Sequence, residues 1–151
     1  TVVGVGLGAP VAVIAAAEDD IPGLAVSHGF GSVDAVIAHQ FGRRWSKDRG
    51  DWVWLPARLL GRLLNWYARI PSVDDLASQL DGDQRAWMLS ATDDHRLPRA
   101  ATANLREAFE QSQAQFSFTS ATGGHLRGED DPRIPGLLQQ VEAWMIEHDL
   151  H

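Results

Sequence analysis

Two short stretches of this sequence carry side chains that could work together as an acid and a base. The first is Thr92-Asp93-Asp94-His95-Arg96-Leu97-Pro98, which follows an apolar run at Ala86–Leu89. The second is Ser120-Ala121-Thr122-Gly123-Gly124-His125, which follows a strand-like run at Gln115–Thr119. A carboxylate that holds a histidine in one tautomer and stabilises its protonated form makes that histidine an effective general base and acid. The two stretches therefore predict an aspartate–histidine pair that includes His125.

The elements that must position this pair follow from the pattern of apolar residues. Strands and helices alternate along the chain, which is typical of a parallel sheet with right-handed crossovers. Because catalytic groups of open α/β sheets lie at the carboxyl edge, we expect the aspartates and His125 to meet there. The fold class is therefore α/β, a single domain over 1–151 with a parallel sheet of about four strands flanked by helices. The expected strands are Val2–Val5, Leu24–Ser27, Ala86–Leu89 and Gln115–Thr119, and the expected helices are Val11–Ala17, Val33–Gln40, Ala100–Gln111 and Gly136–His148.

The segment 43–80 interrupts this alternation. It is basic and rich in tryptophan, and its residues Leu59, Leu63 and Tyr67 share one face of a predicted helix. We interpret 43–80 as an inserted helical cap over the carboxyl edge of the sheet. Two alternatives stay open: the aromatic residues only pack this segment together, or its helix lies on a membrane surface, which the acidic chain disfavours.

Composition limits the partners. A formal charge of −7 and a pI near 5.2 argue against nucleic acid or an anionic membrane as the main partner, because both would be repelled. The chain has no cysteine and no run of the ~20 apolar residues that a transmembrane helix needs. The compartment stays open, with the cytoplasm slightly favoured. We expect no cofactor and no metal, because the remaining histidines have no ligand spacing: His28, His39, His95, His148 and His151.

Together these segments resemble the C-terminal half of an α/β-hydrolase, the fold family of esterases, lipases and related peptidases. Gly4-Val5-Gly6-Leu7-Gly8 occupies the position of the family's strand-to-helix elbow, G-x-S-x-G. The run 92–98 is similar to the family's acid loop, in which a proline follows the acid by four residues, and this register makes Asp94 the acid and Asp93 its neighbour. Gly123-Gly124-His125 is similar to the family's glycine-flanked histidine, 31 residues after Asp94.

The resemblance implies serine-type hydrolysis of a small ester or amide, with Asp94 and His125 as catalytic acid and base. It also implies substrate contacts at Leu7, Gly29 and Phe30. The nucleophile position, however, is Gly6, and a glycine cannot form the acyl-enzyme on which triad chemistry depends. We therefore expect a chain that is weak or inactive alone.

The resemblance further implies a partner for the first strand. The family's early strands and part of its oxyanion hole should precede the elbow, whereas the sequence here starts at Thr1. We expect an N-terminal segment, a second chain or a second copy to pair with Thr1–Val5, because an unpaired apolar edge strand is a template for another strand. A non-catalytic binding or scaffold protein derived from a hydrolase is the alternative.

Two other functions start from the N-terminal residues. Gly4, Gly6 and Ala9 fit the dinucleotide fingerprint G-x-G-x-x-G/A, although no acidic residue closes the second strand to bind a ribose. Thr1 could serve as an N-terminal nucleophile whose free amine is the base. That class of hydrolase is built on stacked antiparallel sheets, which the alternation of strands and helices does not predict.

Overall fold

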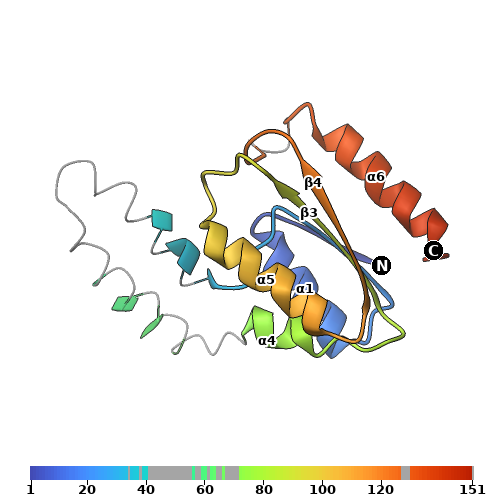
Figure 1. Cartoon of the computed structure of the whole chain (residues 1–151), viewed down its shortest axis with the longest axis horizontal. Helices are drawn as coiled ribbons and strands as arrows, with labels where there is room; N and C mark the ends of the chain where they lie inside the picture. The colour runs from blue at the N-terminus through green and yellow to red at the C-terminus, as the bar shows by residue number, and fades with distance from the viewer. Residues whose placement is uncertain are drawn as a thin grey trace.

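The chain folds around one parallel sheet. The computed structural model describes residues 1–33, 35–37, 39–40, 56, 59–60, 62–63, 66, 72–126 and 130–150. The strands lie in the order β1-β2-β3-β4, each parallel to the next, which confirms the predicted α/β class (Figure 1). The elements are, in chain order, β1 (Val2–Val5), α1 (Gly8–Glu18), β2 (Gly23–Ser27), α4 (Val73–Ser78), β3 (Arg85–Ala91), α5 (Arg99–Gln111), β4 (Gln115–Ala121) and α6 (Ile134–Glu147).

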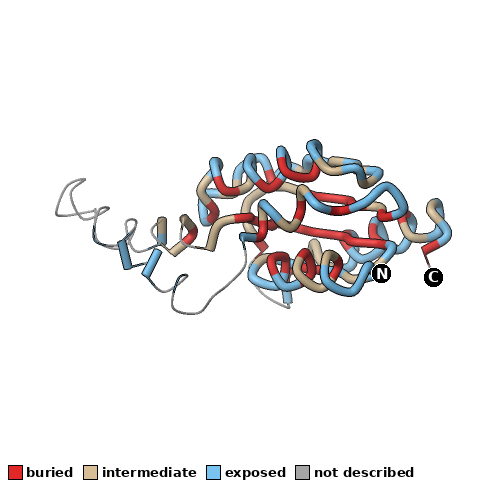
Figure 2. The backbone as a smooth tube through the Cα atoms, turned by 90° about the horizontal axis from the view of Figure 1, so that it is seen from below, coloured by how far each residue is buried: buried red, intermediate tan, exposed pale blue. Residues whose placement is uncertain are grey.

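Helices cover both faces of the sheet. Side chains of a strand alternate between its two faces, so neighbours in β2 and β3 enter different cores. Leu24 and Met88 pack with α1, α4 and α5 on one face, whereas Ala25 and Trp87 pack with α6 on the other. Every residue of β2 is buried, as expected for a parallel strand with helices on both sides. Figure 2 shows this buried sheet between two layers of helix whose outer faces are exposed.

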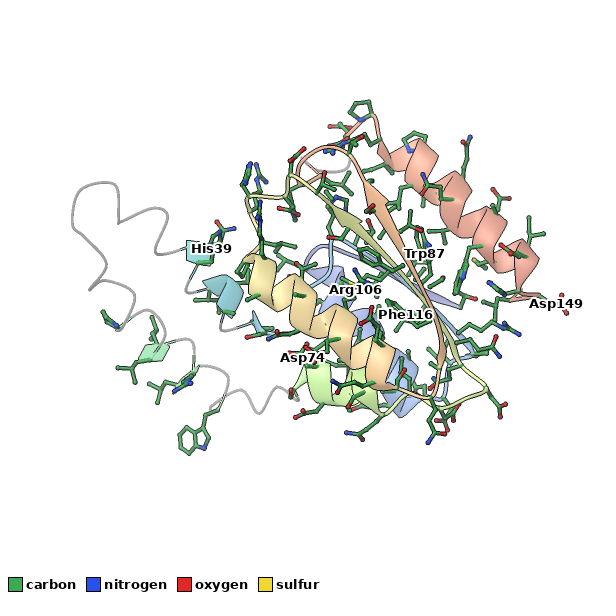
Figure 3. The ribbon with its side chains drawn as sticks, in the orientation of Figure 1. His39, Asp74, Trp87, Arg106, Phe116 and Asp149 are labelled. Atoms are coloured by element: carbon green, nitrogen blue, oxygen red, sulfur yellow. The ribbon has the colours of Figure 1, made fainter. Side chains whose placement is uncertain are left out.

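The side chain of Trp87 anchors α6 to the sheet. Its ring stacks on Trp144 of α6 with centroids 6.4 Å apart, and its indole N–H donates to Thr119 Oγ1 at 3.1 Å (Figure 3). This polar contact satisfies the only hydrogen-bond donor of a buried tryptophan side chain. The packing therefore holds the C-terminal half of α6 against β3 and β4.

Helix α1 lies unusually close to β1. A Cβ on Gly4 would lie 2.7 Å from the Cβ of Ala12 and 2.7 Å from the Cα of Ala9. The small residues of α1 thus pack against the strand backbone itself, as the run of small apolar residues predicts. This close contact brings the turn between β1 and α1 tightly onto the carboxyl edge of the sheet.

Several boundaries differ from those expected. Strands β3 and β4 each continue two residues beyond the apolar run, because the ladder still pairs Ser90 with Ser120 and Ala91 with Ala121. Helix α1 begins at Gly8, three residues before the expected start at Val11. Small polar residues can therefore extend a strand as long as their backbone groups have partners, a feature that hydrophobicity alone does not predict.

The segment 43–80 is described only in part. Its last helix, α4, buries Val73 and Ala77 in the core shared with α1 and α5, so these residues belong to the helix layer of the sheet and not to a cap. Most of 43–71 lies outside the described residues, and the cap stays a prediction there. None of the helices in the described part of the chain is both long and apolar enough to cross a bilayer.

Candidate active site

Backbone hydrogen bonds tie the loops at the carboxyl edge together. The N–H of Gly6 donates to the carbonyl of Ser27 (2.9 Å), that of His28 to Leu89 (2.9 Å) and that of Thr92 to Ala121 (3.0 Å). Each bond continues the parallel ladder just beyond a strand end. The turns after all four strands consequently start from one continuous edge, which places the predicted site residues within reach of one another.

Asp94 and His125 form the predicted pair. Their Oδ2 and Nδ1 atoms lie 2.7 Å apart. The other carboxylate oxygen of Asp94 accepts the backbone N–H groups of Arg96 (2.9 Å) and Leu97 (3.2 Å), which fixes the plane of the carboxylate. The side chain of Asp94 is 8% exposed, and that of His125 is 20% exposed. Because the carboxylate occupies Nδ1, the Nε2 atom of His125 is left to exchange protons with a substrate or a nucleophile.

Gly6 lies opposite that nitrogen. Apart from the residues on either side of Gly6, the atom nearest to a Cβ built on Gly6 would be Nε2 of His125, 3.9 Å away. Gly6 has a φ of +56°, a conformation that side chains rarely adopt but that a strained strand-to-helix elbow requires. An oxygen one bond beyond this Cβ could come within hydrogen-bonding distance of His125. The structure thus brings the three predicted site residues, Gly6, Asp94 and His125, together.

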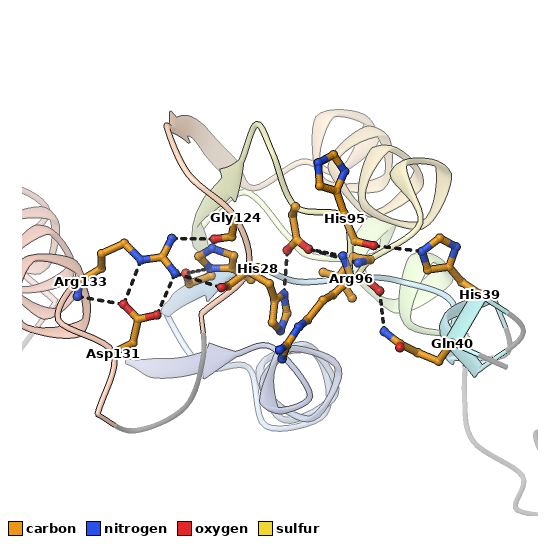
Figure 4. Close-up of polar contacts among 12 residues, drawn as sticks. His28, His39, Gln40, His95, Arg96, Gly124, Asp131 and Arg133 are labelled. Carbon is orange, nitrogen blue, oxygen red and sulfur yellow. Dashed lines mark hydrogen bonds and ion pairs between the residues drawn. The ribbon is translucent and has the colours of Figure 1, made fainter. Parts of the chain in front are cut away.

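A second ion pair holds the loop that carries His125. The guanidinium of Arg133 donates to the carbonyls of Gly124 (2.6 Å) and His125 (2.9 Å). It also donates from Nε and Nη2 to both carboxylate oxygens of Asp131, at 2.9 and 2.8 Å (Figure 4). The hydrogen bond to Asp131 raises the pKa of Arg133 above its ordinary value. The sequence analysis did not identify this pair, although two opposite charges directly before a predicted helix were a visible signal.

His28 is the other residue that the sequence analysis missed as part of this site. It is only 4% exposed, and its ring meets that of His125 edge to face with centroids 5.6 Å apart. Its Nδ1 lies 2.8 Å from the hydroxyl of Ser27. Burial lowers the pKa of His28, and the nearby charge of Asp94 opposes this shift. His28 therefore favours the neutral form beside the candidate base.

The three expected substrate contacts lie in different environments. Leu7 follows Gly6 directly, heads α1 and is 80% exposed. Phe30, in contrast, is buried with Leu97 and Ala101. Gly29 is equally enclosed, since a Cβ there would lie 2.3 Å from the side chain of Val26. Leu7 is therefore placed beside Gly6, whereas Gly29 and Phe30 pack the interior.

Two further expectations concern residues near these loops. The backbone N–H of Asp93 donates to the carbonyl of Gly123 at 3.2 Å, so Asp93 joins the acid and histidine loops through its main chain. The hydroxyl of Thr1 donates to the carbonyl of Leu150 at 3.1 Å, at the amino end of β1 and away from the site. The described strands form a single parallel sheet, which is not the stacked antiparallel arrangement of N-terminal nucleophile hydrolases.

Within residues 1–33, 72–126 and 130–150, no group of three or more His, Asp or Glu side chains is placed to hold a metal ion.

An open cavity of about 480 Å³ adjoins the pair of Asp94 and His125. The polar lining of the cavity combines two imidazoles, two guanidinium groups and two carboxylates: His95, His125, Arg96, Arg133, Asp93 and Asp131.

Comparisons with known proteins identify the fold. No protein-family model matches the sequence, and no curated protein matches it significantly. Two structures of an esterase from Pyrococcus furiosus are 15% and 12% identical, with TM-scores of 0.58 and 0.64, and each covers 96% of this chain. A meta-cleavage product hydrolase from Pseudomonas fluorescens is 13% identical with a TM-score of 0.55, and covers 97% of this chain. The fold is that of an α/β-hydrolase.

The match covers only part of each α/β-hydrolase. The chain spans 51% and 52% of the two esterase structures and 64% of the meta-cleavage product hydrolase. In this fold the triad residues follow the chain order nucleophile, acid, histidine, and Gly6, Asp94 and His125 keep that order. The three positions expected from the resemblance lie just after β1, β3 and β4.

Proposed function

We propose that this chain provides the acid and the base of a serine-hydrolase-type centre, with Gly6 at the position of the nucleophile. The implied substrates are small esters or amides. The observation that carries the proposal is the direction of the Cα–Cβ vector at Gly6, which ends 3.9 Å from Nε2 of His125. A strand-to-helix turn with a positive φ, aimed at a histidine that is bound to an aspartate, is the arrangement that nucleophilic catalysis needs.

The proposed roles follow from the hydrogen bonds. Asp94 holds His125 with Nδ1 facing the carboxylate and stabilises the imidazolium that forms when Nε2 takes a proton. His125 would take that proton from an attacking oxygen and then give it to the leaving group. Gly6 offers no such oxygen, so no acyl-enzyme forms on it. We therefore propose that the chain alone is weak or inactive as a hydrolase.

The partner proposal rests on the free edge of β1. This strand pairs only with β2 among the described strands, and its residues Val3 and Val5 are 44% and 39% exposed. Leu7 and Val11, at the start of the adjoining helix, are also exposed. An apolar strand with one unpaired edge is a template for strand addition. We propose that another strand, from a further segment, a second chain or a second copy, pairs with β1.

The lack of a nucleophilic side chain at Gly6 favours a second candidate function, the binding of a ligand without catalysis. The same geometry without a nucleophile would serve a protein that binds a small molecule at the carboxyl edge and does not react with it. In that case Asp94 and His125 would act as hydrogen-bonding groups for the ligand. A nucleophile restored at Gly6 separates the two possibilities, because only a catalytic geometry would activate it.

The deciding experiment is the Gly6→Ser variant, treated with a fluorophosphonate probe and with activated esters. We expect a covalent adduct at Ser in Gly6→Ser, detected by intact mass and peptide mapping. The matched control is Gly6→Ala, which has the same backbone strain but no hydroxyl and should remain unlabelled. If folded Gly6→Ser reacts no faster than Gly6→Ala, the proposed catalytic geometry is wrong.

A further inference from the structure

A second cavity lies on the α6 side of the sheet. It has a volume of about 550 Å³, within the range of small-molecule sites. The cavity lies between the carboxyl ends of β3 and β4 and the first turns of α6, and its described lining includes neither Gly6 nor Asp94. Its apolar wall comes from Leu89, Leu126 and Leu137, and its polar lining comes from His28, Thr119, Ser120, Thr122, Arg133 and Gln140.

The imidazole of His28 is part of the cavity lining, and one of its nitrogens is buried without a hydrogen-bond partner among the described residues. His28 is 4% exposed, and its Nε2 has no hydrogen-bond partner in the described part of the chain. The backbone of His28 is fixed by its N–H bond to the carbonyl of Leu89 and by a φ of +53°. A buried polar atom without a partner costs about 1–3 kcal/mol, so a group that binds Nε2 would recover this energy.

The hydrogen bond to Ser27 determines what Nε2 offers. The hydroxyl of Ser27 is buried, and within the described part of the chain its one hydrogen-bond partner is Nδ1 of His28, at 2.8 Å. If the hydroxyl donates to Nδ1, its proton is satisfied, and the ring proton of the neutral imidazole must be on Nε2. The opposite tautomer would leave the hydroxyl proton of Ser27 buried without an acceptor. Nε2 is therefore a donor, and it requires an acceptor oxygen.

The charges around the cavity favour a neutral ligand. The one cationic side chain of its described lining, Arg133, already donates to both oxygens of Asp131 and to the carbonyls of Gly124 and His125. The other polar groups are hydroxyls and an amide. An anion would thus find no uncompensated positive charge, whereas a carbonyl group could accept from His28 and place its apolar part against Leu137.

We propose that this cavity is a binding site for a small neutral molecule with a carbonyl oxygen, such as an ester or an amide, held by the Nε2–H group of His28. The site is distinct from the catalytic positions at Gly6, and it does not depend on the proposed hydrolysis. Its contact with the reaction centre is the edge-to-face packing of His28 on His125.

The test is an NMR titration of the unmodified chain with N-methylacetamide and with ethyl acetate. Long-range ¹H–¹⁵N correlation spectra of ¹⁵N-labelled protein report each imidazole nitrogen. We expect a saturable shift of the His28 Nε2 resonance with millimolar affinity, whereas the exposed ring of His95 should not respond. Acetate, a carboxylate of similar size, should give no saturable shift.

A cavity-filling variant locates the binding. Gly136 lines the cavity, and a Cβ there would meet no atom within 4 Å. Gly136→Leu should therefore fill the cavity and abolish the His28 response while it improves the helix propensity of α6. Gln139→Leu changes a nearby exposed residue of the same helix that is not part of the cavity lining, and it should bind as wild type.

Four results would overturn the proposal. They are the absence of a saturable His28 shift, equal shifts at all histidines, equal binding of acetate, and unchanged binding by Gly136→Leu. A protected water at Nε2 that neither probe displaces would assign the cavity to structural water only. Labelling of Gly6→Ser by fluorophosphonate tests a different residue and reaction, so the two proposals can fail separately.

Discussion

Nε2 of His125 lies 3.9 Å from the position of a Cβ on Gly6, while Nδ1 of the same ring lies 2.7 Å from Asp94. The two nitrogens of one imidazole thus face Gly6 and Asp94, the positions that we propose for the nucleophile and the acid. This proposed geometry can be tested by placing a hydroxyl at Gly6 and then removing the groups that support His125.

Asp94 should control the reactivity of a restored nucleophile. In the Gly6→Ser background, Asp94→Asn should reduce the rate of fluorophosphonate labelling by up to about 10⁴-fold, because the amide favours the wrong tautomer of His125. Asp93→Asn is the matched control, since Asp93 contacts the histidine loop through its backbone N–H. Time courses of labelling by mass spectrometry give both rates. Equal effects of the two substitutions would show that Asp94 has no special role.

Gly4 should tolerate no side chain. Its virtual Cβ lies 2.7 Å from the Cβ of Ala12 and from the backbone of α1, so Gly4→Ala must push the helix away from β1. We expect a loss of about 1–3 kcal/mol in the free energy of unfolding, the usual cost of overpacking. Gly8→Ala is the control, because its Cβ would meet no atom within 4 Å. Urea denaturation of the two variants tests this, and similar midpoints would contradict the close packing of α1.

Arg133 should keep the His125 loop in place. Arg133→Met removes the donors to the carbonyls of Gly124 and His125 and leaves the buried carboxylate of Asp131 without its cation. We expect a lower melting temperature and faster amide exchange in the loop that ends at His125. Arg133→Lys should restore only part of the effect, because an ammonium group lacks the planar fork of the guanidinium.

A surface arginine provides the control for this prediction. Arg99→Met changes an exposed residue in the first turn of α5. It should alter neither the melting temperature nor the amide exchange of the loop that ends at His125. If Arg133→Met and Arg99→Met show the same amide exchange around His125, the ion pair of Arg133 and Asp131 does not position the loop.

Much of the fold could be predicted because it depends on local patterns. Apolar runs mark all four strands, and their alternation with helices requires a parallel sheet whose carboxyl ends share one edge. That edge explains why Asp94 and His125 meet. The same logic did not identify the burial of Phe30, because this depends on contacts with Leu97 and Ala101, residues more than sixty positions away.

The parts of the site that could not be predicted depend on the path of the loops. Arg133 reaches the carbonyls of Gly124 and His125 only because the chain turns back before α6. The side chain of His28 lies in the site because its backbone is left-handed, with a φ of +53°. No residue pattern predicts this conformation for a histidine. Both features depend on three-dimensional proximity more than on residue type.

The stability of the protein should depend on pH through His28. Burial lowers the pKa of His28 in the folded state below its unfolded value of 6.5. The unfolded chain therefore binds more protons as the pH falls through this value, and the free energy of unfolding decreases. The contribution of His28 is fully present above about pH 6.5 and is lost progressively toward the lower, folded-state pKa.

A comparison of variants isolates this contribution from the other groups around the ring. Asp94, His125, Arg133 and Asp131 all act on His28 electrostatically and are unchanged in His28→Gln. Urea denaturation at a series of pH values should show a shallower decrease of stability below pH 6.5 for His28→Gln than for wild type. The exposed His95→Gln should behave as wild type. Identical pH profiles of wild type and His28→Gln would show that His28 does not carry this dependence.

The free edge of β1 should make the isolated chain self-associate. Val3 and Val5 are 44% and 39% exposed on a strand whose outer edge has no partner among the described strands, and a lysine on such an edge opposes strand pairing. We expect Val5→Lys to shift the sedimentation distribution toward monomer at high concentration. Leu138→Lys is the matched control, because Leu138 is 54% exposed on α6, away from the edge. A wild-type chain that stays monomeric at every concentration, or an equal effect of the two lysines, would rule out association through β1.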